Sequence, residues 1–273
     1  MDWNAAALTR REGAVVSEFM NSMSSTGHFT TETGVNVPAV TADQMRELDR
    51  IAVEETGPSL LQMMENAGRN LALLAMELMG PRWRSAKILI LAGSGGNGGG
   101  GICTARHLSN HGVSVSLCLA APDGLSEAAA VQRKIFQSTN GNEVKPSELA
   151  NLEPDLTIDA LIGYGLKAAP RGTAAELIAQ ANTGNVPILS LDVPSGIDST
   201  TGRAPGEFIR PTWTMTLALP KSGLLPQVTG QLFLADIGIP VVGFRRVAPS
   251  YISPYGNRFR VGLIYGRSQR PPT

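Results

Sequence analysis

The chain has 273 residues, with 23 lysines and arginines against 23 aspartates and glutamates, and only 17% of its residues are charged. A balanced charge argues against a nucleic-acid binder that neutralises phosphates and against a polybasic membrane-surface protein. No apolar run approaches the roughly 20 residues of a membrane-spanning helix. A hydrophobic content of 42% is enough for a core, and the 30 glycines exceed the usual share of about 7%.

The first elements that the sequence predicts are two amphipathic helices. T-x-x-Q and S-x-x-Q capping boxes precede apolar residues at helical spacing, which predicts helices over 42–56 and 59–79. The Gly-Pro dipeptide at 57–58 separates the two helices. We interpret Met63 and Met64 as core residues of the second helix.

From residue 87 onward the sequence alternates between strands and helices. The run Ile-Leu-Ile-Leu-Ala at 88–92 is continuously apolar, as in a strand that is buried on both faces. Alternating strands and helices predict an α/β fold with a mostly parallel sheet and helices on both faces. The predicted strands are 88–92, 113–119, 156–161, 187–193, 214–219 and 232–237, with helices through 105–108 and over 126–137 and 173–181 between them.

The domain organisation follows from these patterns. We expect a single domain over 38–243, a flexible N-terminal extension over 1–37 and a loose C-terminal tail over 244–273. The N-terminal stretch lacks the apolar core of a secretory signal. We therefore expect a cytoplasmic protein and leave a mitochondrial location open.

A glycine-rich loop is the strongest local signal. Seven of the nine residues over 93–101 are glycine, directly after a strand and before a helix. Such a loop lets backbone N–H groups and a helix N-terminus face an anion. A dehydrogenase would also need an acid at the end of the second strand, but that place is occupied by Leu119 and Ala120. This disfavours a nicotinamide-dependent oxidoreductase.

Polar residues also stand at the ends of later strands. Asp159 ends one strand, Asp192 and Ser195 follow the next, and Lys221 follows the strand after that. In open α/β sheets ligands collect outside the carboxyl ends of the strands, so these side chains are site candidates. A buried Asp159 would need a partner or a bound cation.

The few cysteines and histidines exclude other kinds of site. Two cysteines exclude a disulfide scaffold, and no C-x-x-C spacing is present. His107 and His111 stand four residues apart, a spacing that suits a metal, but no third ligand is near them in the sequence. We interpret them as a solvated helix face.

Five segments in order complete the pattern: the glycine-rich loop, D-A-L-I-G-Y-G from Asp159, D-V-P-S-G-I-D-S-T-T-G from Asp192, L-P-K-S-G around Lys221, and A-D-I-G-I-P before residue 241. Together they resemble the YjeF N-terminal domain family, whose enzyme members are NAD(P)H-hydrate epimerases. The resemblance covers about 40–240. It implies a Rossmann-like three-layer αβα sandwich and interconversion of the R and S hydrates of NADH and NADPH at C6 of the nicotinamide ring.

The resemblance also implies roles for individual residues. Asp192 and Lys221 would be catalytic, with Asp192 as the acid or base and Lys221 tuning its charge or orienting the ring. A potassium ion would bind to Asn97, Asp159 and Ser195, whose oxygen atoms suit a hard cation. Substrate contacts would come from Asp192 and from two loops, Gly96, Asn97, Gly98, Gly99 and Gly100 in the first and Gly163, Tyr164, Gly165, Leu166, Lys167, Ala168 and Ala169 in the second.

Two loop positions depart from the family pattern. The family loop reads G-x-G-N-N-G-G-D-G, whereas this chain has Gly96 at the first Asn position and Gly100 at the Asp position. The alternative hypothesis is therefore a catalytically silent nucleotide-binding or interaction module on the same fold. Under the epimerase hypothesis the substrate is NADHX or NADPHX, and we expect a separate NAD(P)H-hydrate dehydratase as functional partner. A homodimer through the helices over 42–79 stays open.

Overall fold

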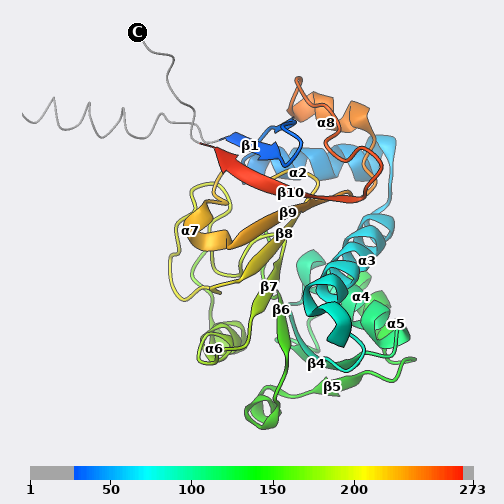
Figure 1. Ribbon diagram of the computed structural model, residues 1–273, viewed down its shortest axis with the longest axis vertical. Helices are drawn as coiled ribbons and strands as arrows, with labels where there is room; N and C mark the ends of the chain where they lie inside the picture. The colour runs from blue at the N-terminus through cyan, green and yellow to red at the C-terminus, as the bar shows by residue number, and fades with distance from the viewer. Residues whose placement is uncertain (1–27, 267–273) are drawn as a thin grey trace, which may run out of the picture.

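The computed structural model describes residues 28–266, and these form one ten-stranded sheet with helices on both faces (Figure 1). The strand order is β2-β1-β10-β9-β8-β7-β6-β3-β4-β5. Neighbouring strands are parallel from β9 to β5 and antiparallel from β9 to β2. The predicted α/β fold with a mostly parallel sheet is confirmed.

The strands are β1 His28–Thr31, β2 Asn36–Val37, β3 Lys87–Ala92, β4 Ser114–Leu119, β5 Asn142–Val144, β6 Leu156–Ala160, β7 Ile188–Leu191, β8 Trp213–Leu217, β9 Gln231–Ala235 and β10 Arg260–Gly266. The α-helices are α2 Ala42–Ile51, α3 Leu60–Met79, α4 Gly96–Asn110, α5 Glu127–Phe136, α6 Gly172–Ala181, α7 Pro226–Thr229 and α8 Val241–Val247. Short helical turns are η1 Ala52–Thr56, η2 Gly80–Arg82 and η3 Pro146–Asn151.

The strand β3 shows why the sheet is covered on both faces. Ile88 and Ile90 point into the core under α3, α4 and α5, while Leu89 and Leu91 point into the core under α6. Side chains alternate between faces along a strand, so a strand that is apolar throughout needs a layer on each side. Figure 1 shows these helices on opposite sides of the sheet, which is the predicted three-layer sandwich.

The two capping boxes form as predicted and set the starts of α2 and α3. Thr41 caps α2 and Ser59 caps α3, each together with a glutamine three residues later. The first predicted helix, 42–56, is confirmed as a helical run, of which residues 42–51 form α2 and residues 52–56 continue it as the π-helical turn η1.

The predicted boundaries of the domain are wrong at both ends within the described residues. Residues 28–31 and 36–37, placed in a flexible extension, form β1 and β2, and residues 260–266, placed in a loose tail, form β10. β10 pairs with β9 on one side and with β1 on the other, so the two chain ends complete the same sheet. The pairing of β1 with β10 joins segments more than 200 residues apart, which local patterns do not reveal. The rest of the predicted extension and tail, 1–27 and 267–273, lies outside the described residues.

The sheet topology creates a binding edge between β3 and β6. The chain leaves β3 through α4 towards β4 on one side, whereas β6 lies on the other side of β3. At such a switch point the two loops after the strands separate and leave a crevice. The glycine-rich loop and the loop after β6 both emerge there.

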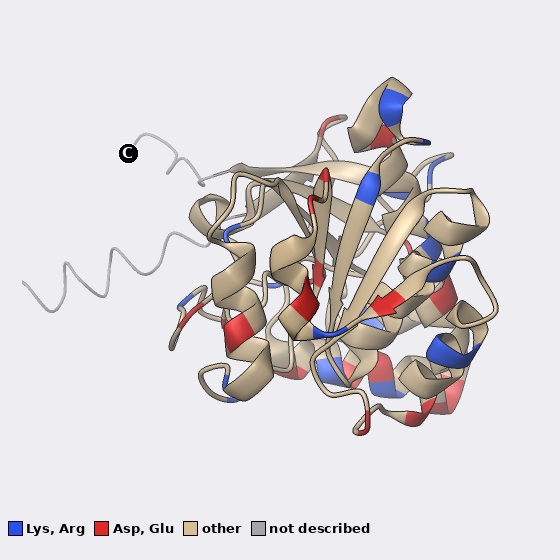
Figure 2. Ribbon diagram, turned by 90° about the horizontal axis from the view of Figure 1, so that it is seen from below, with Lys and Arg blue, Asp and Glu red and all other residues tan. Residues whose placement is uncertain are grey.

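Charged residues lie mostly on the helices and loops, with acidic and basic positions mixed (Figure 2). Among residues 28–266, none of the helices has the length and apolar character needed to span a bilayer.

Candidate active site

A cavity of about 500 Å³ opens at the carboxyl ends of β3, β6, β7 and β8. Its floor is the edge of the sheet, and its cover comes from α2 and α3. It brings together residues from the glycine-rich loop, the loop after β6, Asp192 and Lys221. Segments that are far apart in the sequence therefore meet where the topology predicts a ligand site.

Asp192 and Lys221 form a buried ion pair on the cavity wall. Their side chains are only 5% and 1% exposed, and Lys221 Nζ contacts Asp192 Oδ1 directly. Lys221 Nζ also donates to the Leu217 carbonyl at 3.0 Å and to Thr216 Oγ1 at 3.2 Å. All three ammonium hydrogens thus have acceptors, which holds the lysine rigidly against the carboxylate. The predicted lysine and acid are brought together by the fold.

The backbone around this ion pair adopts unusual conformations. Asp192 has a φ of +67° and Ala218 has a φ of +62°, and they are the non-glycine residues with positive φ among the described positions. They follow the neighbouring strands β7 and β8 directly. Such conformations cost about 1–3 kcal/mol each and cluster at functional sites. The strain makes this corner of the cavity a candidate place for chemistry.

The N-terminus of α4 supplies the opposite side of the cavity. Gly95 is the N-cap and carries no side chain, and the first turn is formed by residues 96–99. A Cβ at Gly95 or Gly96 would meet nothing within 4 Å, so the backbone there is open to a ligand. The free N–H groups of a first helical turn attract anions. Of the predicted loop residues, Gly96, Asn97 and Gly100 line the cavity.

The other loop glycines serve close packing. A Cβ at Gly98 would stand 1.8 Å from the Gly93 carbonyl oxygen, and one at Gly99 would stand 2.5 Å from Met64 Cε. Neither residue lines the cavity, in contrast to the predicted substrate contact. At Gly100 a Cβ would stand 2.8 Å from Leu191 Cδ2. Leu191 therefore fills part of the space that an aspartate side chain would need.

The loop after β6 contributes through its first half. Gly163, Tyr164 and Gly165 line the cavity, whereas the predicted contacts over 166–169 do not. The Tyr164 N–H donates to Asp192 Oδ2 at 3.2 Å, and the Lys221 Nζ lies 5.8 Å from the centre of the Tyr164 ring. This tyrosine is the closest link between the loop and the ion pair.

Asp159 and Ser195 form a second polar group beneath the loops. Asp159 is fully buried, and its carboxylate accepts from Ser195 Oγ at 2.5 Å, Ser195 N at 2.9 Å, Ser190 Oγ at 2.8 Å and Leu161 N at 3.2 Å. Burial raises the pKa of the Asp159 carboxyl, and the four hydrogen bonds counteract part of that rise. Asp159 and Ser195, which the resemblance named together as ligands of one ion, are therefore in direct contact.

Residues from α2 and α3 complete the cavity, although the sequence did not mark them as site residues. They are Met45, Asp49, Leu60, Met63, Met64 and Ala67. The methionine pair is buried as predicted but also faces the ligand space. A signal for Asp49 exists in the sequence: it is an acid on the apolar stripe of an amphipathic helix, one turn after Met45.

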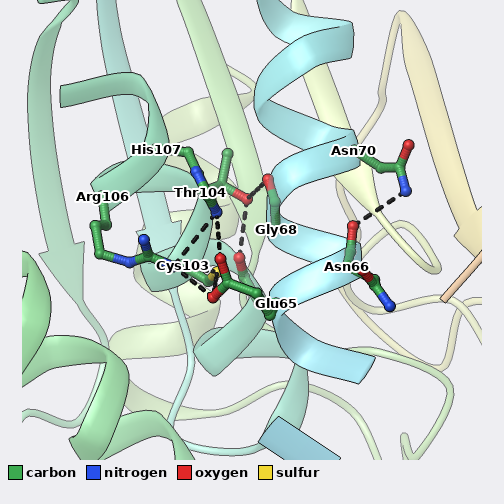
Figure 3. Close-up of polar contacts among 9 residues, drawn as sticks. Glu65, Asn66, Gly68, Asn70, Cys103, Thr104, Arg106 and His107 are labelled. Atoms are coloured by element: carbon green, nitrogen blue, oxygen red, sulfur yellow. Dashed lines mark hydrogen bonds and ion pairs between the residues drawn. The ribbon is translucent and has the colours of Figure 1, made fainter. Parts of the chain in front are cut away.

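A separate charged group, which we call the Glu65 cluster, joins α3 to α4 away from the cavity (Figure 3). It consists of Glu65, Cys103, Arg106 and His107. Glu65 accepts from Arg106 Nη2 at 2.5 Å and contacts His107 Nε2 at 2.8 Å. The interpretation of His107 as part of a solvated helix face is wrong, because its side chain is only 16% exposed.

Comparisons with known proteins agree with this geometry. A model of the family described as YjeF-related protein N-terminus matches residues 60–223. A protein of Dehalogenimonas lykanthroporepellens named NAD(P)H-hydrate epimerase is 51% identical over 228 residues, which cover 83% of this chain and 93% of that protein. A Moorella thermoacetica protein named bifunctional NAD(P)H-hydrate repair enzyme Nnr is 37% identical, and 85% of this chain aligns with 45% of it.

The fold also matches a solved structure. The crystal structure of the yeast protein Ynu0 superposes with a TM-score of 0.71 at 22% identity, covering 83% of this chain and all of that chain. The span matched by the family model contains the glycine-rich loop, Asp159, Asp192, Ser195 and Lys221. The chain therefore belongs to the YjeF-related protein N-terminus family.

Proposed function

We propose that this protein is an NAD(P)H-hydrate epimerase, which interconverts the R and S forms of the hydrates NADHX and NADPHX. The observation that carries the proposal is the buried Asp192–Lys221 pair at a strained corner of a cavity whose other side is an open helix N-terminus. The relative that shares 51% identity bears the name of this activity. An isomerase of this kind needs a positioned acid or base and a dinucleotide site, and the cavity offers both.

The charges of the cavity suggest how the dinucleotide lies. Asp49, Asp192 and Lys221 stand at the strained corner, where the one positive charge is already paired with Asp192. The pyrophosphate would instead be attracted by the free N–H groups of α4. The uncharged, hydrated nicotinamide ring would then lie between Asp192 and the Tyr164 ring.

Asp192 is the proton-transfer group of this proposal, and Lys221 is the residue that holds it. Exchange of the hydroxyl on C6 between the two faces of the ring requires a proton to be given and taken at that oxygen. Lys221 keeps the Asp192 carboxylate at one place, and the Tyr164 N–H orients its second oxygen. The apolar side chains of Met63, Met64 and Leu191 limit the access of water to this end.

A potassium ion fits the group formed by Asn97, Asp159 and Ser195. All three offer oxygen atoms, the ligands that hard cations prefer. Asp159 is fully buried, and within residues 28–266 no cationic side chain pairs with it. The buried Asn97 Nδ2 is a hydrogen-bond donor without a partner among the described residues, so it is free to donate to a substrate oxygen, while the Oδ1 of the same amide is the atom that would bind the ion. When bound, the ion supplies positive charge that balances the carboxylate beneath both ligand loops.

A stereochemical assay tests the function. NADHX enriched in the R form is incubated with the protein, and the two isomers are followed by chromatography, with a dehydratase that consumes only the S form in a second reaction. We expect R to convert to S faster than in buffer alone, and faster in potassium than in tetramethylammonium chloride. Binding of NADHX without faster conversion would instead support the silent module.

A further inference from the structure

Asp49 is a carboxylate of the cavity wall that the reaction described above does not use. It lies on α2, where Asp43 and Glu47 pair with Arg46 and Arg50 on the outer surface. Asp49 instead faces inward and lines the cavity. A carboxylate on the inner face of an amphipathic helix is costly, so its presence calls for a partner or a task.

One tyrosine connects Asp49 to the strained corner. Tyr164 Oη donates to Asp49 Oδ2 at 2.5 Å, and no other hydrogen bond or ion pair to the Asp49 carboxylate is formed by the described part of the chain. The backbone N–H of the same tyrosine donates to Asp192 Oδ2 at 3.2 Å. The two carboxylates are thus held at opposite ends of one tyrosine, Asp49 by α2 and Asp192 by the end of β7.

Inversion at a carbon that carries a nitrogen and a hydroxyl requires access to two faces. When the hydroxyl leaves C6, the ring nitrogen stabilises a planar cation, and the new hydroxyl has to arrive from the opposite face. Inverting glycosidases solve the related problem at a sugar carbon with two separated carboxyl groups, one acting as an acid on one face and one as a base on the other. The cavity likewise contains two carboxyl groups, Asp49 and Asp192, which come from different elements.

We propose that Asp49 is the second proton-transfer residue of the epimerase and acts across the nicotinamide ring from Asp192. The inference rests on the proposed function. Protonated Asp49 gives its proton to the hydroxyl oxygen, the C6–O bond breaks with its electron pair, water leaves, and the N1 lone pair forms a C=N bond. On the other face Asp192 takes a proton from a water molecule as that oxygen bonds to C6, and the C=N electron pair returns to N1.

The step balances without any further reactant. One water leaves and one enters, and the net proton that moves from Asp49 to Asp192 returns through solvent. In the reverse direction the two carboxyl groups exchange roles, as an epimerase requires. Tyr164 serves as the hydrogen-bond partner that keeps the Asp49 carboxyl aimed into the cavity.

The environment of Asp49 shifts its ionisation towards the protonated form. Burial raises the pKa of this carboxyl, although the hydrogen bond from Tyr164 and the charge of Lys221 counteract part of the rise. An acid that must carry a proton at neutral pH needs a shift in this direction. The charged and titratable groups that act on it are Tyr164, Asp192 and Lys221 in the cavity, and Arg46 on its own helix lies near Tyr164. On α8, which packs against α2, Arg246 pairs with Glu55 and Arg245 donates to the Tyr251 carbonyl.

The decisive experiment compares Asp49→Asn with Asp43→Asn, the same substitution on the outer face of the same helix. We measure R-to-S conversion, its pH profile and thermal unfolding. We expect Asp49→Asn to lose about 10²-fold or more in rate, and Asp43→Asn to stay within twofold of wild type. In the wild type the rate should fall as the pH rises through the raised pKa of Asp49, and this limb should disappear in Asp49→Asn.

Two further measurements separate proton transfer from mere positioning. Tyr164→Phe removes only the partner hydroxyl, so we expect a smaller loss than in Asp49→Asn. Conversion in ¹⁸O-labelled water should place one label on C6 for each inversion. Where Asp49→Asn does not fold, Asp49→Glu provides the test, because it keeps the charge but displaces the carboxyl and should slow conversion.

Each contrary result overturns the inference. It fails if Asp49→Asn and Asp49→Glu convert R to S within twofold of an active wild type, or if Asp49→Asn, Tyr164→Phe and the double variant lose the same factor. Retention of the original oxygen on C6 also excludes it, because the ring would then open instead. A wild type that converts R to S no faster than buffer contradicts the proposed function itself, which is a different outcome.

Discussion

Two groups of charged side chains in this protein are similar in their residue types but differ in their surroundings. The Asp192–Lys221 pair and the Glu65 cluster both join segments that are distant in the sequence. The ion pair is almost fully buried, has a strained backbone and faces a cavity, whereas Glu65 is 43% exposed and ties α3 to α4 (Figure 3). Charge clustering alone therefore does not identify a candidate site, and neither does an adjoining hollow, because Glu65 also lines one. Burial and a strained backbone set the Asp192–Lys221 pair apart.

The Glu65 cluster also shows how a protein can occupy its own cation position. The ligand-type atoms of Glu65, Cys103 and His107 lie within 4.8 Å of one another. Arg106 Nη2 stands among them, at 2.5 Å from Glu65 Oε2 and 3.3 Å from both the Cys103 sulfur and His107 Nε2. Burial raises the pKa of the Cys103 thiol to about 12, so it stays protonated at neutral pH. The guanidinium thus takes the place that a metal would need.

Replacing Asp192 should produce the largest loss of activity. Asp192→Asn removes the proton-transfer group but keeps the shape of the side chain, so we expect a loss of about 10²–10⁴-fold in R-to-S conversion. Glu65→Gln, the same carboxyl-to-amide change in the Glu65 cluster, should leave the rate within twofold. Equal rates for the two variants would remove the distinction between the regions.

Lys221→Met should produce the largest loss of stability. It leaves the Asp192 carboxylate buried without its cation, and breaking a buried pair in this way costs about 3–5 kcal/mol. Urea unfolding measures the difference. Lys134→Met, at an exposed position of α5, is the matched control and should change the free energy of unfolding by less than about 0.5 kcal/mol. A loss no larger than that of the control would mean that the pair does not stabilise the fold.

Glu65→Gln should have a smaller effect on stability and a defined pH dependence. We expect a loss of about 1 kcal/mol, or roughly 2–4 °C in the unfolding midpoint. Burial opposes ionisation of Glu65, but Arg106 and His107 outweigh it and lower the pKa of the carboxyl. A lowered pKa in the folded state gives stability above the ordinary pKa of glutamate, which is lost as the pH falls through the folded value. The difference between wild type and variant should therefore shrink in acid. A difference that grows in acid would contradict this assignment.

Removing Arg106 should have the smallest but most diagnostic effect. In Arg106→Ala the three ligand-type side chains of the Glu65 cluster lose their cation, and a thiol, an imidazole and a carboxylate suit zinc. We expect added Zn²⁺ to raise the unfolding midpoint of the variant and not that of the wild type. A zinc-dependent rise in the wild type would show that the guanidinium does not occupy the cation position.

Local sequence patterns predicted many of the elements and much of the site. The capping boxes before α2 and α3 and the apolar run of β3 depend on residues only a few positions apart. The sequence indicated four polar residues because they lie at or just after the ends of apolar strands: Asp159, Asp192, Ser195 and Lys221. The pairings of β1 and β10, and the contribution of α2 to the cavity, were missed because they join segments without a local signal.

The glycine-rich loop shows the same division within nine residues. The sequence indicated that backbone approaches a ligand there, yet Gly98 and Gly99 are required by contacts with Gly93 and Met64. Only the folded chain distinguishes these packing positions from Gly95 and Gly96, where the backbone is open. It also shows that Leu191 takes up space beside Gly100.

The sequence by itself determined the α/β class, the polar residues that follow the strands and the family resemblance, because each of these depends on short, contiguous patterns. Only the tertiary structure decided that Tyr164 contacts Asp49, 115 residues away, and that Lys221 closes on Asp192 rather than on solvent. Such contacts are set by the order of strands in the sheet and by which helix covers its edge. Both result from burying apolar surface over the whole chain, so no local pattern encodes them.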